Sequence, residues 1–211
     1  MPCPDDAAAR LAAEISACRL CAERFAATRT AHAPRPVAWF ASPARLLIAG
    51  QAPGLRVHES GRPFSDASGE RLREWTSLDE GAFYDRARVA IVPMAFCFPG
   101  YDERGSDLPP PRLCRETWHA RVMATLPALR LMLLVGGHAQ RWHLGTRAGV
   151  TQTVADWRTH AAPARGPRVF PLPHPSWRNT AWLRRNPWFE TELLPELRRA
   201  VEEVMHDDPS A

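Results

Sequence analysis

Hydrophobic residues along the chain fall into two patterns, short continuous runs and stretches in which they recur at helical spacing. Four short apolar runs, bounded by Gly, Pro or charged residues, predict buried strands. Around them, apolar residues three or four positions apart predict amphipathic helices. We expect strands at 45–49, 89–94, 131–135 and 169–172, and helices at 5–27, 68–78, 114–125, directly after 135, and at 187–204.

The alternation of strands with helices predicts an α/β fold. We expect a three-layer sandwich in which helices flank a central, mainly parallel four-stranded sheet. No internal repeat or linker divides the chain, so residues 1–211 are expected to form a single domain. The first helix would present Leu11, Ile15 and Leu20 to the core, and Ser68 would cap the second.

The chain shows no sign of membrane insertion or export. It has no run of about 18 uncharged apolar residues. Its N-terminal segment carries acidic residues and lacks the basic and apolar regions of a signal peptide. We therefore expect a cytoplasmic protein with no membrane partner, and we expect it to be a monomer.

The basic residues are unusual because all 27 are arginines and none is lysine. The net charge of +4 permits a polyanionic partner such as nucleic acid without requiring one. Arginine favours bidentate contacts to phosphate. The absence of lysine excludes a P-loop lysine and any lysine Schiff-base mechanism.

Three loops carry the candidate chemistry, because sites in parallel sheets form at the carboxyl ends of strands. GQAPG (50–54) follows the first strand, the loop that begins near Cys97 follows the second, and PHPSWRN (173–179) follows the fourth. We expect these loops to meet at one edge of the sheet.

The five cysteines are Cys3, Cys18, Cys21, Cys97 and Cys114. Disulfides are not expected in a cytosolic protein. Two readings stay open for Cys18, Cys21, Cys97 and Cys114: buried free thiols, or a four-thiolate site for zinc or an iron–sulfur cluster. The second is favoured because Cys97 and Cys114 flank a loop without regular structure, which a metal would order. Cys3 is interpreted as a bystander.

Taken together, these features resemble the uracil-DNA glycosylase superfamily, especially its thermophile-type, iron–sulfur-containing branch. The resemblance covers roughly residues 15–200. Its pieces occur in the family's order: the C-x2-C pair, GQAPG followed by GRPF (61–64), the Cys97 and Cys114 pair, LLVGGHA (133–139) and HPSWRN (174–179).

The resemblance implies hydrolysis of the bond between uracil and deoxyribose in DNA, after the base has left the stack. His174 matches the histidine that donates to uracil O2, and Phe64 matches the residue that stacks on the base. Gly50, Gln51 and Ala52 match the turn whose backbone faces the base and the water. The alternatives are a turn-capping role for His174 and a core role for Phe64.

Water activation departs from the family pattern. The thermophile-type branch has a Glu at the position of Gln51, and the mesophilic branch has an Asp at the position of Ala52. Asp66 resembles an aspartate that another branch carries just after its Phe, so we expect Asp66 to activate water and Gln51 to position it. The alternative for Asp66 is a turn residue or helix N-cap. His58 is a further candidate base.

Base reading also departs from the pattern. The family usually places an Asn four residues before its third cysteine, and Pro93 occupies that position here. Recognition of the base would then depend on backbone groups near Met94 and Ala95, or the preferred base differs.

The second signature is expected to grip DNA. In the family, the residues after HPS insert a wedge into the duplex, and an aromatic and basic stretch follows here. The candidates are Trp177, Arg178, Asn179, Arg184 and Arg185. Trp188 is interpreted as a core residue.

The resemblance implies a [4Fe–4S] cluster held by Cys18, Cys21, Cys97 and Cys114, with zinc as the alternative. The expected partner is DNA containing uracil. Two other functions stay open: a uracil- or damaged-DNA-binding protein without turnover, and a hydrolase of free nucleosides or nucleobase conjugates. A glycosylase for another deaminated base, such as hypoxanthine or xanthine, is a variant of the first reading.

Overall fold

A four-stranded, all-parallel sheet forms the centre of the protein, as seen in a computed structural model that describes residues 4–206. The strands are β1 (Leu46–Ala49), β2 (Val89–Ile91), β3 (Leu131–Val135) and β4 (Arg168–Leu172), in the order β2-β1-β3-β4. This confirms the predicted α/β sandwich. The strand β2 ends at Ile91, earlier than the predicted Met94, although bonds from Val92 N to Ile48 O and from Met94 N to Gly50 O, both 2.9 Å, still join the following segment to β1.

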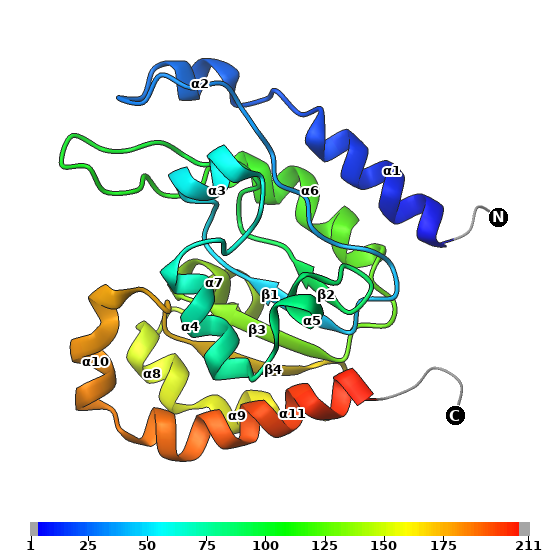
Figure 1. Cartoon of the computed structure of the whole chain (residues 1–211), viewed down its shortest axis with the longest axis vertical. Coiled ribbons are helices and arrows are strands. Elements are labelled where there is room, and N and C mark those ends of the chain that lie inside the picture. The colour runs from blue at the N-terminus through cyan, green and yellow to red at the C-terminus, as the bar shows by residue number, and fades with distance from the viewer. Residues whose placement is uncertain (1–3, 207–211) are drawn as a thin grey trace.

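Helices cover both faces of the sheet (Figure 1). The predicted helices are seen at α1 (Pro4–Ser16), α4 (Ala67–Thr76), α6 (Arg112–Ala124), α7 (Gly137–Leu144) and α11 (Leu194–His206), the last preceded by a π-helical turn (Phe189–Leu193). The helix α2 (Ala22–Ala26) lies within the helix predicted over 5–27. Short helices that were not predicted are α3 (Leu55–Ser60), α5 (Glu80–Tyr84), α8 (Val150–Ala155), α9 (Trp157–Ala161), a 3₁₀ turn (Trp177–Asn179) and α10 (Thr180–Arg185).

The prediction of one helix over 5–27 was wrong. Leu11 and Ile15 are buried, but Leu20 is 59% exposed, so the apolar stripe does not continue through it. The chain turns between α1 and α2, where the Arg19 guanidinium bonds the carbonyl oxygens of Ser16 and Cys18 at 3.2 and 2.8 Å. This turn carries the Cys18–Cys21 pair.

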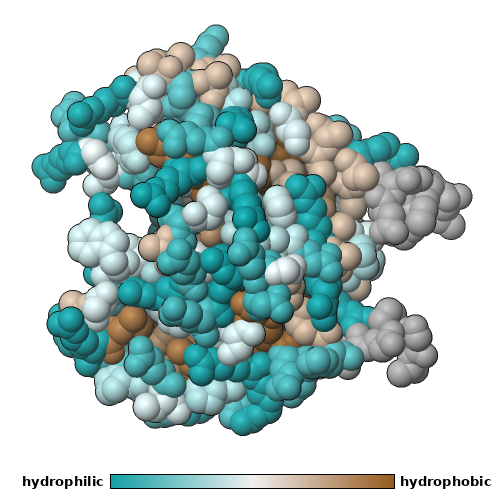
Figure 2. All heavy atoms as spheres, viewed as in Figure 1, coloured by the Kyte–Doolittle hydropathy of each residue, from teal (hydrophilic) through white to brown (hydrophobic). Residues whose placement is uncertain are grey.

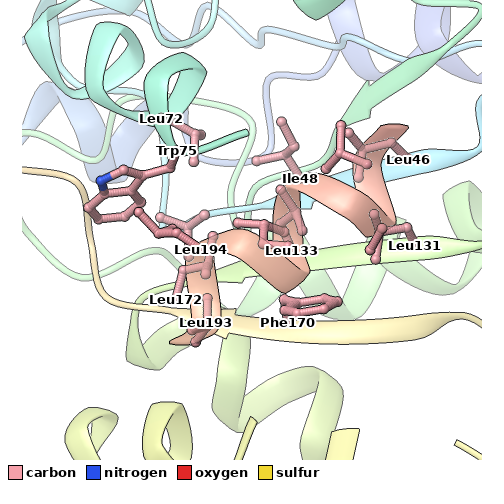
Figure 3. Packing of buried hydrophobic residues seen from close by; sticks show 14 of the residues in the cluster. Leu46, Ile48, Leu72, Trp75, Leu131, Leu133, Phe170, Leu172, Leu193 and Leu194 are labelled. Atoms are coloured by element: carbon pink, nitrogen blue, oxygen red, sulfur yellow. The ribbon is translucent and has the colours of Figure 1, made fainter. Parts of the chain in front are cut away.

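Two apolar layers pack on the sheet because side chains alternate between its faces along each strand. Leu46 and Ile48 point into one layer with α4, α5, α8, α9 and α11, and Figure 3 shows Leu72 and Trp75 of α4 in it. Leu47 and Ala49 point into the other layer with α1, α6 and α7. Burying one such Leu side chain contributes roughly 1.5–3 kcal/mol.

The surface in Figure 2 is mostly hydrophilic, with small hydrophobic patches between polar residues. Within residues 4–206, no helix is both long enough and apolar enough to span a bilayer. The exposed large hydrophobic residues are Leu20, Leu113, Trp142 and Trp177.

The segment 98–111, between β2 and α6, forms a long loop that projects on the side of α2 and α3 (Figure 1). Its two arms meet through a bridge between Tyr101 and Asp107 and a bond from Leu108 N to Gly100 O of 2.9 Å. Asp102 closes the tip by accepting from the backbone N–H groups of Arg104 and Ser106. The loop therefore has a defined shape without regular secondary structure.

Candidate active site

A cavity of about 110 Å³ lies at the carboxyl ends of β1 and β4. It is smaller than the several hundred Å³ of typical drug-sized sites, and so suits a single ring. The lining residues are Val37, Gly50, Gln51, Ala52, Pro53, Gly54, Val57, Pro63, Phe64, Asp66, Ser68, Ile91, Pro93, Asp107 and His174. The predicted Gly50, Gln51, Ala52, Phe64, Asp66 and His174 thus meet in one place.

The GQAPG turn is fixed to the segment that follows β2. The backbone N–H groups of Met94 and Ala95 donate to the carbonyl oxygens of Gly50 and Gln51 at 2.9 and 3.2 Å. Both residues are buried, and neither lines the cavity. The structure therefore does not bring Met94 and Ala95 to the cavity as readers of a base, and only the neighbouring Pro93 reaches its wall.

Phe64 adopts a conformation that is unusual for a large side chain. Its φ is 52°, in the left-handed region, which costs of order 1–3 kcal/mol. Its carbonyl oxygen accepts from the Tyr84 hydroxyl at 3.0 Å, and its ring packs edge-on against Phe83. A Cβ built on Gly50 would lie 3.7 Å from the tip of the ring. The ring is thus held over the GQAPG turn as part of the cavity wall.

His174 is held in one tautomer. Its Nδ1 accepts a hydrogen bond from the backbone N–H of Ser176 at 3.2 Å. Burial lowers the pKa of His174, while the charge of Asp66 raises it, and the net direction is downward. The ring is therefore neutral with its proton on Nε2, which is a hydrogen-bond donor. The predicted turn-capping role and a donor role are compatible, because they use different nitrogens.

Asp66 caps α4, with its Oδ1 accepting from Gly69 N at 3.2 Å. This corrects the prediction that Ser68 caps the helix, and it confirms the alternative reading of Asp66 as an N-cap. The carboxyl also lines the cavity and lies near enough to His174 to influence its pKa.

His58 lies away from this cavity. It is on α3, where its ring contacts His32 at 5.1 Å and Phe98 at 6.0 Å between centroids. Burial, followed by the charges of His32 and Arg35, lowers its pKa. The predicted base role for His58 finds no support in this placement, because α3 turns its side chain toward the 98–111 loop.

The sequence analysis missed Asp107. The 98–111 loop returns over the site and adds Asp107 to the cavity lining. The residue as a whole is exposed, yet enough protein surrounds its carboxyl for desolvation to raise its pKa, an effect that Asp66 reinforces and Arg178 opposes. Only the fold-back of the loop reveals this residue, and the sequence carries no motif for it.

Residues 38–198 match the family model described as the Uracil DNA glycosylase superfamily. The chain belongs to this superfamily. Membership suggests DNA glycosylase activity, with DNA as the partner. The matched region contains every residue that lines the cavity except Val37.

Trp177, in the loop after His174, is the most exposed large hydrophobic residue among residues 4–206, with 74% of its surface exposed. The Arg178 guanidinium carbon lies 5.9 Å from the centre of the Trp177 ring. Asn179 does not point outward; its Nδ2 donates to the His174 carbonyl oxygen at 2.7 Å. Arg184 and Arg185 are exposed on α10. Trp188 is partly buried against the core, as predicted.

A second cavity, of about 240 Å³, adjoins the first, because Gln51 and His174 line both. Its other walls come from the start of α7 and from residues near α8 and α10. The lining residues include Gly136, Gly137, His138, Thr151, Asn179 and Trp182. Gln51 and His174 thus form the partition between the two cavities.

The four cysteines that were predicted to form a thiolate site lie together in the structure. Cys18, Cys21, Cys97 and Cys114 line one apolar cavity of about 20 Å³ and are free thiols. Burial, followed by the charge of Cys114, raises the pKa of Cys97 to about 12, and burial raises that of Cys114 to about 11. Cys3 lies outside the described residues.

The donor set, four thiols around one apolar cavity, is of the kind that holds either zinc or an iron–sulfur cluster. Within residues 4–206, no three or more His, Cys, Asp or Glu side chains are placed to hold one metal ion. The Phe96 N–H already donates to Cys114 Sγ at 3.4 Å, the kind of contact that stabilises a bound thiolate.

Proposed function

We propose that the protein is a monofunctional glycosylase that excises uracil from DNA by hydrolysis. The observation that carries the proposal is the single-ring cavity in which Phe64, His174, Gln51 and Asp66 meet. Excision in this cavity requires that the base first leaves the DNA helix, because the reacting bond is out of reach inside a duplex.

The cavity can stabilise the departing base. As the N-glycosidic bond breaks, its electron pair moves onto the base, and negative charge spreads to O2. The neutral His174 donates from Nε2 to that oxygen, and the Phe64 ring stacks on the face of the base. A neutral donor is suited to this role because its pKa, lowered by burial, keeps it from being protonated before the reaction.

Water completes the reaction. The water oxygen bonds to C1′ of the sugar, and its proton passes to the Asp66 carboxylate, while Gln51 orients the water. One oxygen of Asp66 is occupied by the α4 N-cap, which leaves the other for this proton. Because the chain has no lysine, strand cleavage through a lysine imine is excluded and the product is an abasic site.

The exposed Trp177 and Arg178 supply the contact with DNA. The Trp177 ring fills the space left by the base, and Arg178 holds phosphate or the orphan base. Asn179 positions His174 through the hydrogen bond from its Nδ2 to the His174 carbonyl oxygen.

The four clustered cysteines are proposed to hold a [4Fe–4S] cluster, which would tie the segment between α1 and α2 to both ends of the 98–111 loop. The cluster supplies no step of the hydrolysis. Its contribution is to the folded structure.

One observation favours a second function, that of a uracil-DNA-binding protein without turnover. Gln51 and Ala52 occupy the usual carboxylate positions, and Asp66 already caps a helix. Asp66 would then be structural, and the cavity would retain the base without cleaving it.

A labelled oligonucleotide with one uracil tests the proposal. After incubation with protein, alkali should cut the strand at the uracil, and no cut should appear without alkali. Asp66→Asn should slow excision, and it keeps the capping oxygen of α4. Tight binding of uracil DNA with no excision would instead establish the binding function.

A further inference from the structure

The cavity lacks hydrogen-bonding groups on the wall that the end of β2 supplies. The Pro93 carbonyl oxygen is bonded to His119 Nε2 at 2.7 Å, inside the protein. The N–H groups of Met94 and Ala95 are used by the GQAPG turn. A base in the cavity would therefore find only the apolar ring of Pro93 on that side.

Two of the other polar lining residues are partly engaged in hydrogen bonds within the protein. His174 uses one nitrogen in its turn, and Asp66 uses one oxygen as an N-cap. Asp107 differs from both, because its carboxyl makes no hydrogen bond or ion pair with any residue in 4–206. It is an acceptor that faces the cavity and has no protein partner.

The 98–111 loop holds Asp107 in a defined place. Its bridge to Tyr101 and the neighbouring bond from Leu108 N to Gly100 O fix the backbone on either side. Gly100 has a φ of 94° and approaches Thr28 so closely that an added Cβ would lie 2.9 Å from that side chain. The loop is thus anchored against the segment after α2, and the carboxyl is presented by a rigid support.

Asp107 shares its surroundings with two charges of opposite sign. Asp66 raises its pKa and Arg178 lowers it, after the larger upward effect of partial burial. The carboxyl has no hydrogen-bond partner in the described protein and is partly desolvated, so it is available to accept from a ligand N–H.

We propose that Asp107 reads the base, by accepting a hydrogen bond from the lactam N–H of a deaminated base. This inference rests on the proposed function and names the substrate class of the same cavity. Uracil, the single-ring base of this class, carries such an N–H at N3. Cytosine has a lone pair at N3, which repels the carboxyl oxygen, so the normal base is rejected.

Single-turnover excision compares the wild type with Asp107→Ala and Asp107→Asn, on oligonucleotides with uracil, 3-methyluracil or cytosine. The matched control is Glu103→Ala, which removes an exposed acid from the same loop outside the cavity. Asp107→Ala should reduce uracil excision about 10- to 100-fold, the effect of losing one good base contact. Asp107→Asn, whose amide oxygen still accepts, should restore most of the rate.

The methylated base provides the decisive comparison. It lacks the N3–H, so the wild type should excise it much more slowly than uracil. Asp107→Ala removes the acceptor and opens space for the methyl group, so its rates on uracil and 3-methyluracil should converge. Affinity for an oligonucleotide with a tetrahydrofuran abasic site should be the same in all variants, because no base is present.

Uracil excision by Asp107→Ala within twofold of the wild-type rate would overturn the inference alone. An equal loss of affinity for uracil and abasic oligonucleotides would also overturn it, since Asp107 would then act on the DNA backbone or on the loop. If the wild type excises none of the bases, the proposed function falls. The difference in affinity between uracil and abasic oligonucleotides, and its loss in Asp107→Ala, then still tests base reading.

Discussion

Gly69, in the first turn of α4, lies directly against the carbonyl oxygen of Phe64, so that a Cβ on Gly69 would be 1.8 Å from that oxygen. The same residue donates its N–H to the Asp66 cap. One glycine therefore permits both the left-handed conformation of Phe64 and the position of Asp66.

Gly69→Ala should disturb this arrangement. The added methyl group must displace the Phe64 backbone, since the contact is with main chain and not with a flexible side-chain end. We expect a loss of about 1–3 kcal/mol in the free energy of unfolding and a larger proportional loss of excision. Gly149→Ala is the control, because a Cβ there meets no atom within 4 Å. Equal stability and activity of both variants would contradict the expectation.

His174→Ala should lower the rate of uracil excision by about 10²–10³-fold, because one hydrogen-bond donor to the developing charge is lost. Its affinity for abasic DNA should change little, since the proposed DNA contacts come from Trp177 and Arg178. Stopped-flow or quench kinetics and equilibrium binding separate the two effects. Unchanged excision would show that the proton donor lies elsewhere.

Trp177→Ala should impair excision from duplex DNA more than from single strands, because only the duplex needs its gap filled. In a plot of the logarithm of the DNA-binding constant against the logarithm of the salt concentration, Arg178→Ala should reduce the magnitude of the slope by about 0.9, because one phosphate contact is lost. Arg10→Ala, an exposed arginine on α1, should leave that slope unchanged. A hydrolase of free nucleosides would be indifferent to all three changes.

Acid should destabilise the fold through its buried histidines. Burial, followed by the charge of His119, lowers the pKa of His143 from 6.5 to about 4. Between these values the unfolded chain binds a proton that the folded chain does not, so stability is lost as the pH falls from 6.5 toward 4. The loss from this one residue is roughly 2–3 kcal/mol.

Urea unfolding at a series of pH values measures that loss. His143→Gln should flatten the decline between pH 6.5 and 4, whatever its effect at neutral pH. His206→Gln, at an exposed position at the end of α11, should follow the wild type. A decline in His143→Gln as steep as in the wild type would assign the acid sensitivity to other groups.

Cys18→Ser should destabilise the protein and remove any brown colour of the purified wild type, because a cluster would lose one of its four ligands. Iron and sulfide analysis of both proteins is the measurement, with Cys3→Ser as the control. A colourless wild type that contains zinc would refute the cluster and keep the four-thiolate site.

The sheet was predictable because strands buried on both faces appear as continuous apolar runs, as at Leu46–Ala49. The helices α3, α5, α8 and α9 were not, since five or six residues span too few turns to show a period. The turn between α1 and α2 was read as helix because Leu20 was taken to continue the apolar stripe of Leu11 and Ile15, whereas its side chain is exposed.

The site was predicted where it follows strands. Gly50, Gln51 and His174 stand directly after β1 and β4, so their meeting follows from the parallel topology. The positions of His58 and Asp107 relative to the cavity could not be predicted from the sequence. A short helix turns His58 away from the loop it seemed to share, and the fold-back of a Pro- and Gly-rich loop brings in Asp107 from a distant part of the chain.

Gln51 and His174 line both the proposed base cavity of about 110 Å³ and the adjoining cavity of about 240 Å³. A small molecule lodged in the second space would touch the same two side chains without occupying the position of the base. Such a compound would lower kcat and leave KM for DNA unaltered, whereas free uracil would compete with the substrate. Inhibitor design for the proposed glycosylase therefore has two distinct targets, and the kinetic pattern reports which one a compound has reached.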